Sequence, residues 1–148
     1  MKALALVTFA AAIQILPGQL QAASWEAVSL SDKESIFLDA QSVYREGKIL
    51  KAVVLHNFSK VNHLGDDIYP HKSRVVVYEI QCATGQLGYA QWSFHGADLA
   101  TGKTVWTGAV SDVSYFRPDL SSGEQKLLGR VCAPSGSTAQ ADPLDPAQ

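Results

Sequence analysis

Apolar and polar residues alternate over most of the chain between residues 25 and 113, and a period of two is typical of β-strands that bury one face. In the clearest segment, Val76, Tyr78 and Ile80 share one face. Short turns separate most neighbouring segments, which favours antiparallel pairing. We therefore expect a meander of five or six strands over residues 25–30, 35–38, 49–58, 74–82, 87–95 and 103–113.

The pattern changes near the end of this region. Ser121 as N-cap and Glu124 three residues later fit a capping box. Three apolar residues then fall on one helical stripe: Leu127, Leu128 and Val131. The sequence thus predicts a short amphipathic helix over 122–131, packed on one face of the sheet, in a mainly β, α+β fold. The alternative, an edge strand, is disfavoured by the Gly, Glu, Gln and Lys content.

A long polar segment, 59–73, separates two of the expected strands and shows no apolar period. Loops of this length are often functional or mobile. Positive charge is concentrated in and beside this segment, so we interpret five residues as candidate binding residues: Lys60, His63, His71, Lys72 and Arg74. A solvated loop without a ligand is the alternative.

His63 and His71 flank two adjacent aspartates, Asp66 and Asp67. Histidine and carboxylate side chains ligate divalent metals, and histidine also ligates haem. However, this spacing does not place two ligands on one face of a helix, and adjacent aspartates in an extended loop point apart. We therefore expect no metal and no cofactor.

Trp92, Phe94 and Trp106 lie on strands that we expect to be close together. They either pack in the core on the helix-covered face or form an exposed patch on the open face, which would mark a partner surface. Tyr89 has the opposite parity to Trp92, so it is expected on the other face. His56 is expected at the sheet surface.

The face that the helix leaves open also carries apolar residues, namely Ile49, Val53, Leu55, Val75 and Val77. The open face of an antiparallel sheet is normally solvated and polar. We infer that a like subunit covers this face or a sheet edge, which would give a homodimer.

The first 22 residues have the three parts of a secretory signal peptide. Lys2 supplies a positive charge, an apolar run follows, and the small residues Ala22 and Ala23 end it. The run is shorter than the ~20 residues that span a bilayer. We predict cleavage after Ala22 or Ala23 and an exported protein, at the cell surface, secreted or in the periplasm. A buried helix or an uncleaved anchor is the alternative.

Removing the first 22 of the 148 residues leaves 126, which suits one domain. We assign residues 23–132 to that domain. The remaining segment, 133–148, has almost no apolar residues and is expected to be disordered. No further segment is apolar enough for a membrane-spanning helix.

Charge argues against one class of partner. Without Lys2, 11 of the 12 basic residues remain against 14 acidic residues, a net charge of −3. Binding to duplex nucleic acid relies on dense lysine and arginine residues that neutralise phosphate. We therefore expect no nucleic-acid partner.

Both cysteines, Cys82 and Cys132, follow the predicted signal peptide. In an oxidising compartment an isolated pair is most simply a disulfide, which would tie the end of the helix to the sheet. Closing this loop is expected to stabilise the fold by ~4 kcal/mol. Two buried free thiols are the alternative.

The chain shows no catalytic motif. It lacks the Gly-x-Ser-x-Gly elbow of serine hydrolases, and a bonded cysteine pair supplies no thiol nucleophile. These observations favour a binding or structural protein over an enzyme.

Three segments resemble the surface-adhesin protein E-like domain of proteobacterial secreted proteins. They are Phe37-Leu38-Asp39-Ala40-Gln41-Ser42-Val43-Tyr44-Arg45-Glu46-Gly47, Tyr78-Glu79-Ile80-Gln81-Cys82, and the closing segment 118–132. The resemblance implies a six-stranded antiparallel sheet whose C-terminal helix is held by a Cys82–Cys132 bond, in a protein at or outside the envelope. It also implies an adhesin-like role that binds a host matrix protein or another surface protein. A periplasmic accessory protein with no host-facing role is the alternative.

Overall fold

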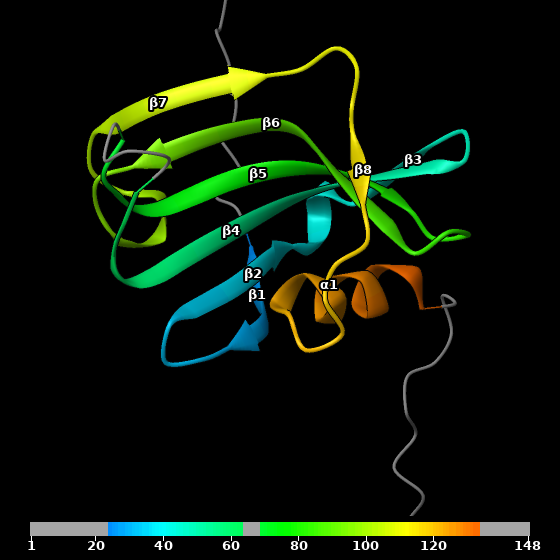
Figure 1. The fold of residues 1–148 in the computed structure, drawn as a ribbon, viewed down its shortest axis with the longest axis horizontal. Helices are drawn as coiled ribbons and strands as arrows, with labels where there is room; N and C mark the ends of the chain where they lie inside the picture. The colour runs from blue at the N-terminus through cyan, green and yellow to red at the C-terminus, as the bar shows by residue number, and fades with distance from the viewer. Residues whose placement is uncertain (1–23, 64–68, 134–148) are drawn as a thin grey trace, which may run out of the picture.

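The computed structural model describes residues 24–63 and 69–133, which form one antiparallel sheet and a C-terminal helix (Figure 1). The elements are β1 (Trp25–Leu30), β2 (Glu34–Asp39), β3 (Tyr44–Glu46), β4 (Ile49–Asn62), β5 (His71–Gln81), β6 (Gln86–His95), β7 (Thr104–Ala109), β8 (Tyr115–Phe116) and α1 (Gly123–Cys132). The predicted mainly β fold is therefore confirmed. The predicted signal peptide, 1–22, and the tail beyond Ala133 lie outside the described residues.

Six strands follow one another across the sheet in the order β1-β2-β4-β5-β6-β7, while β3 pairs with β4 and β8 with β6. The last expected strand, 103–113, is shorter than predicted because β7 ends at Ala109. The chain then turns back to pair Tyr115 with Gly88 of β6. Glycine is required there because the side chain of Val113 occupies the space that a Cβ would fill.

The predicted polar connection 59–73 is wrong in its extent. β4 continues to Asn62, β5 already begins at His71, and these two residues are paired. The pairing register shifts between Asn57 and Asn62. This irregularity interrupts the alternation of apolar and polar residues, so the sequence does not show that the two strands extend this far.

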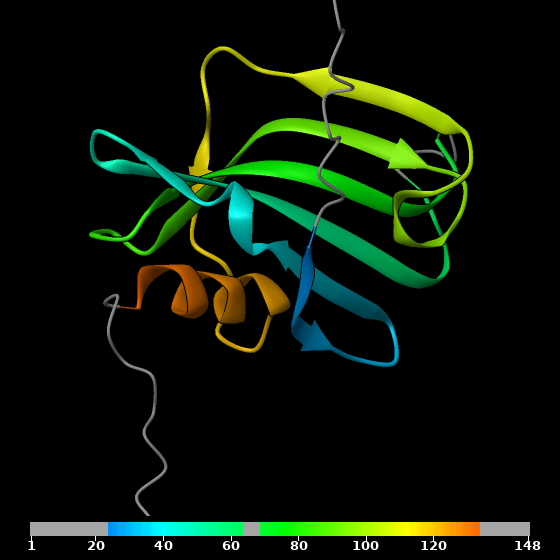
Figure 2. The same cartoon turned by 180° about the vertical axis from the view of Figure 1, so that it is seen from behind.

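Helix α1 lies beside β1 and β2, at the side of the sheet opposite to β7 (Figures 1 and 2). It buries Leu127 and Leu128 in the core. The N-cap is Ser122, and the prediction of Ser121 is wrong by one residue. The hydroxyl of Ser122 accepts a hydrogen bond from the backbone N–H of Gln125 at 3.1 Å, which satisfies a free donor of the first turn.

The predicted disulfide is confirmed. Cys82 follows β5 directly and is bonded to Cys132, the last residue of α1, with 5.5 Å between the Cα atoms. Leu128 packs close to Gly85 in the turn between β5 and β6. The bond therefore fastens the helix at the turn on which it already packs. No helix within residues 24–63 and 69–133 is long and apolar enough to cross a membrane.

A register shift in β6 corrects the expected position of Tyr89. Val76 pairs with Trp92, and Tyr78 pairs with Tyr89. Between these two pairs β5 has one residue and β6 has two, so β6 carries one extra residue. Val76 and Tyr78 share a face, and such a bulge reverses the parity of the residues beyond it. Tyr89 and Trp92 therefore lie on the same face of the sheet, against the prediction.

The second face of the sheet is partly covered by the chain itself. The loop between β6 and β7 contains a short 3₁₀ turn (Asp98–Ala100) that packs on β4 and β5. Ser73 donates a hydrogen bond to the carbonyl of Ala97 at 2.6 Å and accepts one from the N–H of Ala100 at 2.9 Å. Leu55, expected on this face, is fully buried.

Candidate functional site

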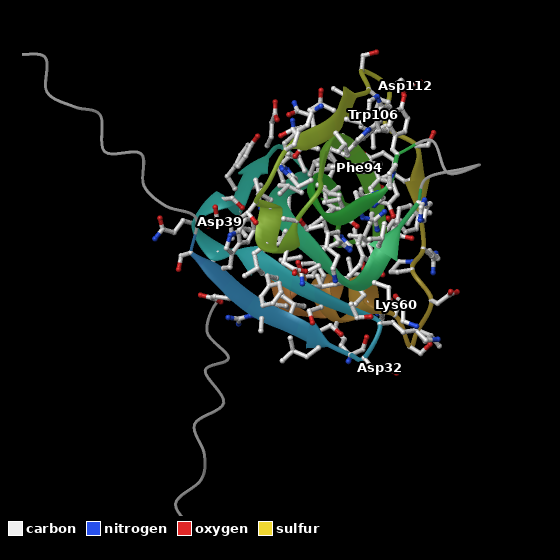
Figure 3. The ribbon with its side chains drawn as sticks, turned by 90° about the vertical axis from the view of Figure 1, so that its left-hand side faces the viewer. Asp32, Asp39, Lys60, Phe94, Trp106 and Asp112 are labelled. Carbon is white, nitrogen blue, oxygen red and sulfur yellow. A yellow bond between two sulfur atoms is a disulfide. The ribbon has the colours of Figure 1, made fainter. Side chains whose placement is uncertain are left out.

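Strands β5, β6 and β7 place aromatic side chains on one face, beyond the part that the helix covers. In register across these strands, Arg74 pairs with Phe94 and Phe94 with Trp106. The next row on the same face joins Val76 to Trp92. We call the following six residues the aromatic cluster: Phe58, Tyr69, His71, Trp92, Phe94 and Trp106. Figure 3 shows Phe94 and Trp106 close together at the β7 side.

The rings of the aromatic cluster contact one another closely. Trp106 stacks on Tyr69 with 4.9 Å between ring centroids, and it meets Phe94 edge-on at 5.3 Å and Trp92 at 5.6 Å. His71 in turn stacks on Phe94, with 4.3 Å between the two ring centroids. Such pairs fix ring orientation and add to the stability gained by burial.

Neither interpretation of Trp92, Phe94 and Trp106 is fully right, and the placement on the open face is wrong. The three residues lie on the face that carries the core, but α1 does not cover this end of the sheet. Phe94 is buried, while Trp92 and Trp106 are half-buried. Part of their aromatic surface is therefore open to solvent.

This arrangement forms a cavity of about 230 Å³ that is open to solvent on one side. Its lining comes from β5, β6 and β7: Arg74, Val76, Tyr89, Trp92, Phe94 and Trp106. We call it the aromatic cavity. The indole of Trp92 lies over Gly108, where a Cβ would come within 2.5 Å of the ring. The absence of a side chain at Gly108 therefore positions one wall of the cavity.

A buried polar chain lies next to the aromatic cavity. His56 is fully buried, so the prediction that it lies at the sheet surface is wrong. Its Nδ1 is 2.6 Å from Glu34 Oε1, and its Nε2 is 3.0 Å from the hydroxyl oxygen of Tyr78. His56 has the same parity as the core residue Val54, so the sequence contained the signal for its burial.

Burial determines the charge states in this chain. It disfavours the imidazolium and lowers the pKa of His56, although the hydrogen bond with Glu34 opposes the effect. Burial alone would raise the pKa of Glu34, but the hydrogen bond with His56 and the nearby charge of Arg74 outweigh it and lower that pKa. We conclude that neutral His56 donates its Nδ1 proton to the Glu34 carboxylate and accepts the proton of Tyr78.

The five candidate binding residues do not form one cluster. Lys60 and His63 are exposed, whereas His71 is buried in the aromatic cluster. Lys72 is half-buried and donates hydrogen bonds to the carbonyls of Phe58 and Ser59, both at 2.7 Å. Their role in binding stays a prediction.

The remaining candidate, Arg74, lies at the aromatic cavity. An open groove of about 570 Å³ runs beside Lys60 instead, along the turn between β1 and β2 and the end of β4. Its lining includes Lys60 and, from the adjoining turn, Asp32 and Lys33. Figure 3 shows Lys60 and Asp32 at the same end of the sheet. The sequence-based list thus joined residues of two different surfaces.

Asp66 and Asp67 lie outside the described residues. Within residues 24–63 and 69–133, no three metal-ligating side chains come together. The expectation that the chain holds no metal or cofactor therefore stays a prediction.

The fold and the cavity together define a small, disulfide-linked β-sheet domain. The chain belongs to the surface-adhesin protein E family, whose model matches residues 25–133. No sequence among curated proteins matches the chain significantly.

Solved structures of Haemophilus influenzae protein E share the fold. One is 13% identical, covers 79% of this chain and 89% of its own length, and gives a TM-score of 0.51. A second crystal form gives 0.53 with the same identity and covers 92% of its own length. Protein E from a non-typeable strain gives 0.50. At this identity the likeness concerns the fold alone.

Proposed function

We propose that this chain is an exported, non-enzymatic binding module of the bacterial envelope that binds a host matrix protein or another surface protein. The family match over residues 25–133 carries this proposal. The disulfide between Cys82 and Cys132 supports export, because such bonds persist in oxidising compartments outside the cytoplasm. We also propose that residues 1–22 or 1–23 are removed on export. The intact mass of the exported chain tests this cleavage.

The groove beside Lys60 is the surface that we propose for partner binding. Its lining includes two exposed lysines, Lys33 and Lys60, together with the exposed Asp32 and the exposed side chain of Val61. Exposed charges of both signs beside apolar surface suit a partner with a complementary charge pattern around an apolar contact, because charge complementarity speeds encounter and sets the register. The aromatic cavity lies on other residues.

The test is saturable binding of the exported chain to a panel of immobilised extracellular-matrix proteins, measured by biolayer interferometry. Lys60→Glu is expected to weaken binding about tenfold, chiefly through slower association. Lys48→Glu is the matched control, since Lys48 is also exposed but lies at the turn between β3 and β4. Binding to no member of the panel above an unrelated protein would remove the host-matrix role.

A homodimer is part of the same proposal. Val53, Val75 and Val77 are half-buried side chains on the second face, in the part that the loop with Asp98–Ala100 leaves open. Burying them against a second copy would gain hydrophobic free energy. Light scattering at micromolar concentration is expected to give twice the chain mass, and Val77→Lys is expected to give the monomer.

A further inference from the structure

Two side chains that line the aromatic cavity carry buried donors that lack acceptors. The Nε of Arg74 and the Nε1 of Trp92 are both buried, and neither has a hydrogen-bond partner within the described residues. Both residues line the cavity. Buried polar groups in folded proteins are normally paired, so two unpaired donors on residues that line one cavity require an explanation.

The charge of Arg74 is also incompletely matched. Its nearest hydrogen-bonding atom is Nδ1 of His56, 3.5 Å from Arg74 Nη2, and the proton of that nitrogen is already directed to Glu34. Its guanidinium carbon lies 5.5 Å from the centroid of the Phe58 ring. Within residues 24–63 and 69–133, Arg74 forms no ion pair. The carboxylate of Glu34 contributes a negative charge, but only from beyond His56.

We propose that the aromatic cavity binds a small carboxylate with a planar apolar body. The rings of Trp92, Phe94 and Trp106 offer flat apolar walls for an aromatic ring, and Arg74 offers the cation that a carboxylate pairs with. About 230 Å³ is below the ~300–1,000 Å³ of pockets for drug-sized ligands, so the ligand has a single ring and a short acidic chain.

Two features separate this proposal from the adhesive role. The lining of the aromatic cavity shares no residue with the groove beside Lys60. The cavity site also needs no macromolecular partner, so it stands or fails independently of matrix binding.

Three matched probes test the proposal on the exported full-length chain by isothermal titration calorimetry. 3-Phenylpropionate is expected to bind saturably with 1:1 stoichiometry and to change the emission of Trp92 and Trp106. 3-Phenylpropan-1-ol, which keeps the ring and lacks the charge, is expected to bind at least tenfold more weakly. Propionate, which keeps the charge and lacks the ring, is expected not to bind at 10 mM, about the highest practical concentration.

Variants locate the site. Arg74→Gln is expected to weaken 3-phenylpropionate at least tenfold and to bring it to the affinity of the alcohol, whereas Arg74→Lys retains part of the affinity. Arg45→Gln, at an exposed residue of β3, is the control and is expected to change nothing. If Arg74→Gln does not fold, the comparison of acid with alcohol on the unmodified chain still decides the charge requirement. No saturable binding of the acid, equal binding of acid and alcohol, or full affinity in folded Arg74→Gln would overturn the proposal.

Discussion

Tyr78 and His56 hydrogen-bond each other in the centre of the sheet, with 3.0 Å between the tyrosine hydroxyl oxygen and His56 Nε2. Both side chains are fully buried, and the far nitrogen of the same imidazole reaches Glu34 at the edge of the core. The chain of three groups passes beside Arg74, whose guanidinium lines the aromatic cavity. The polar chain, on β2, β4 and β5, thus adjoins the candidate ligand site, on β5, β6 and β7, at Arg74.

Removal of the Tyr78 hydroxyl leaves His56 Nε2 buried without a partner. We expect Tyr78→Phe to lower the free energy of unfolding by about 1–3 kcal/mol. Tyr44→Phe is the matched control, because Tyr44 is 55% exposed and makes no hydrogen bond through its hydroxyl within the described residues. Urea denaturation followed by circular dichroism measures both. Equal stability of the two variants would contradict the buried hydrogen bond.

Stability is expected to fall as the pH falls from about 7 to about 5. Burial lowers the folded-state pKa of His56, His71 and His95, so near their ordinary pKa of about 6.5 the unfolded chain binds protons that the folded chain does not. The stability is therefore full above that pH and is lost progressively below it.

Urea midpoints at pH 7, 6 and 5 measure the effect, and His56→Gln is expected to reduce the slope. Below the ordinary pKa of Glu34, protonation of that carboxylate adds a further loss in the same direction, because its folded-state pKa is also lowered. A free energy of unfolding that stays constant or rises between pH 7 and pH 5 would contradict the neutral buried imidazole.

Two glycines are expected to respond in opposite directions to a methyl group. Gly108→Ala places a Cβ within 2.5 Å of the Trp92 indole, which must move, so stability falls by about 1–3 kcal/mol and Trp emission changes. Gly129 lies in α1, and a Cβ added there would meet no atom within 4 Å, so Gly129→Ala stabilises by about 0.5–1 kcal/mol. Thermal unfolding followed by circular dichroism compares the two, and a stabilising Gly108→Ala would show that the indole does not rest on this glycine.

The start of the helix is expected to depend on one of two adjacent serines. Ser122→Ala removes the acceptor for the N–H of Gln125 and is expected to cost about 1 kcal/mol. Ser121→Ala is expected to leave stability unchanged, since Ser121 is exposed and lies before the cap. If urea denaturation found Ser121→Ala to be less stable than Ser122→Ala, Ser121 would be the N-cap, as the sequence predicts.

Most of the fold was predictable because the strands and the helix follow from patterns among residues that are near one another in the sequence. The alternation around Val76 and Tyr78 indicates a strand, and the stripe of Leu127 and Leu128 indicates a helix, whatever the rest of the chain does. The cysteine pair was predictable because only two cysteines are present.

The candidate site was less predictable because it depends on irregular pairing. The bulge that brings Tyr89 to the face of Trp92 leaves no mark in the alternation, and neither does the register shift that carries His71 into the aromatic cluster. Positive charge grouped Arg74 with Lys60, but strand pairing separates them and places Arg74 beside aromatic rings. The burial of His56 was open to prediction, since it required only the parity of Val54 to be extended by two residues.

Surface labelling of intact cells tests the central claim most directly. Lys33, Lys48 and Lys103 are exposed side chains outside the strands, so a membrane-impermeant amine reagent modifies them wherever the folded domain faces the medium. Mass spectrometry after labelling is expected to find these lysines modified in intact cells, while a periplasmic marker protein stays unmodified. Modification only after the outer membrane is opened would contradict a surface-exposed binding module and place the chain in the periplasm.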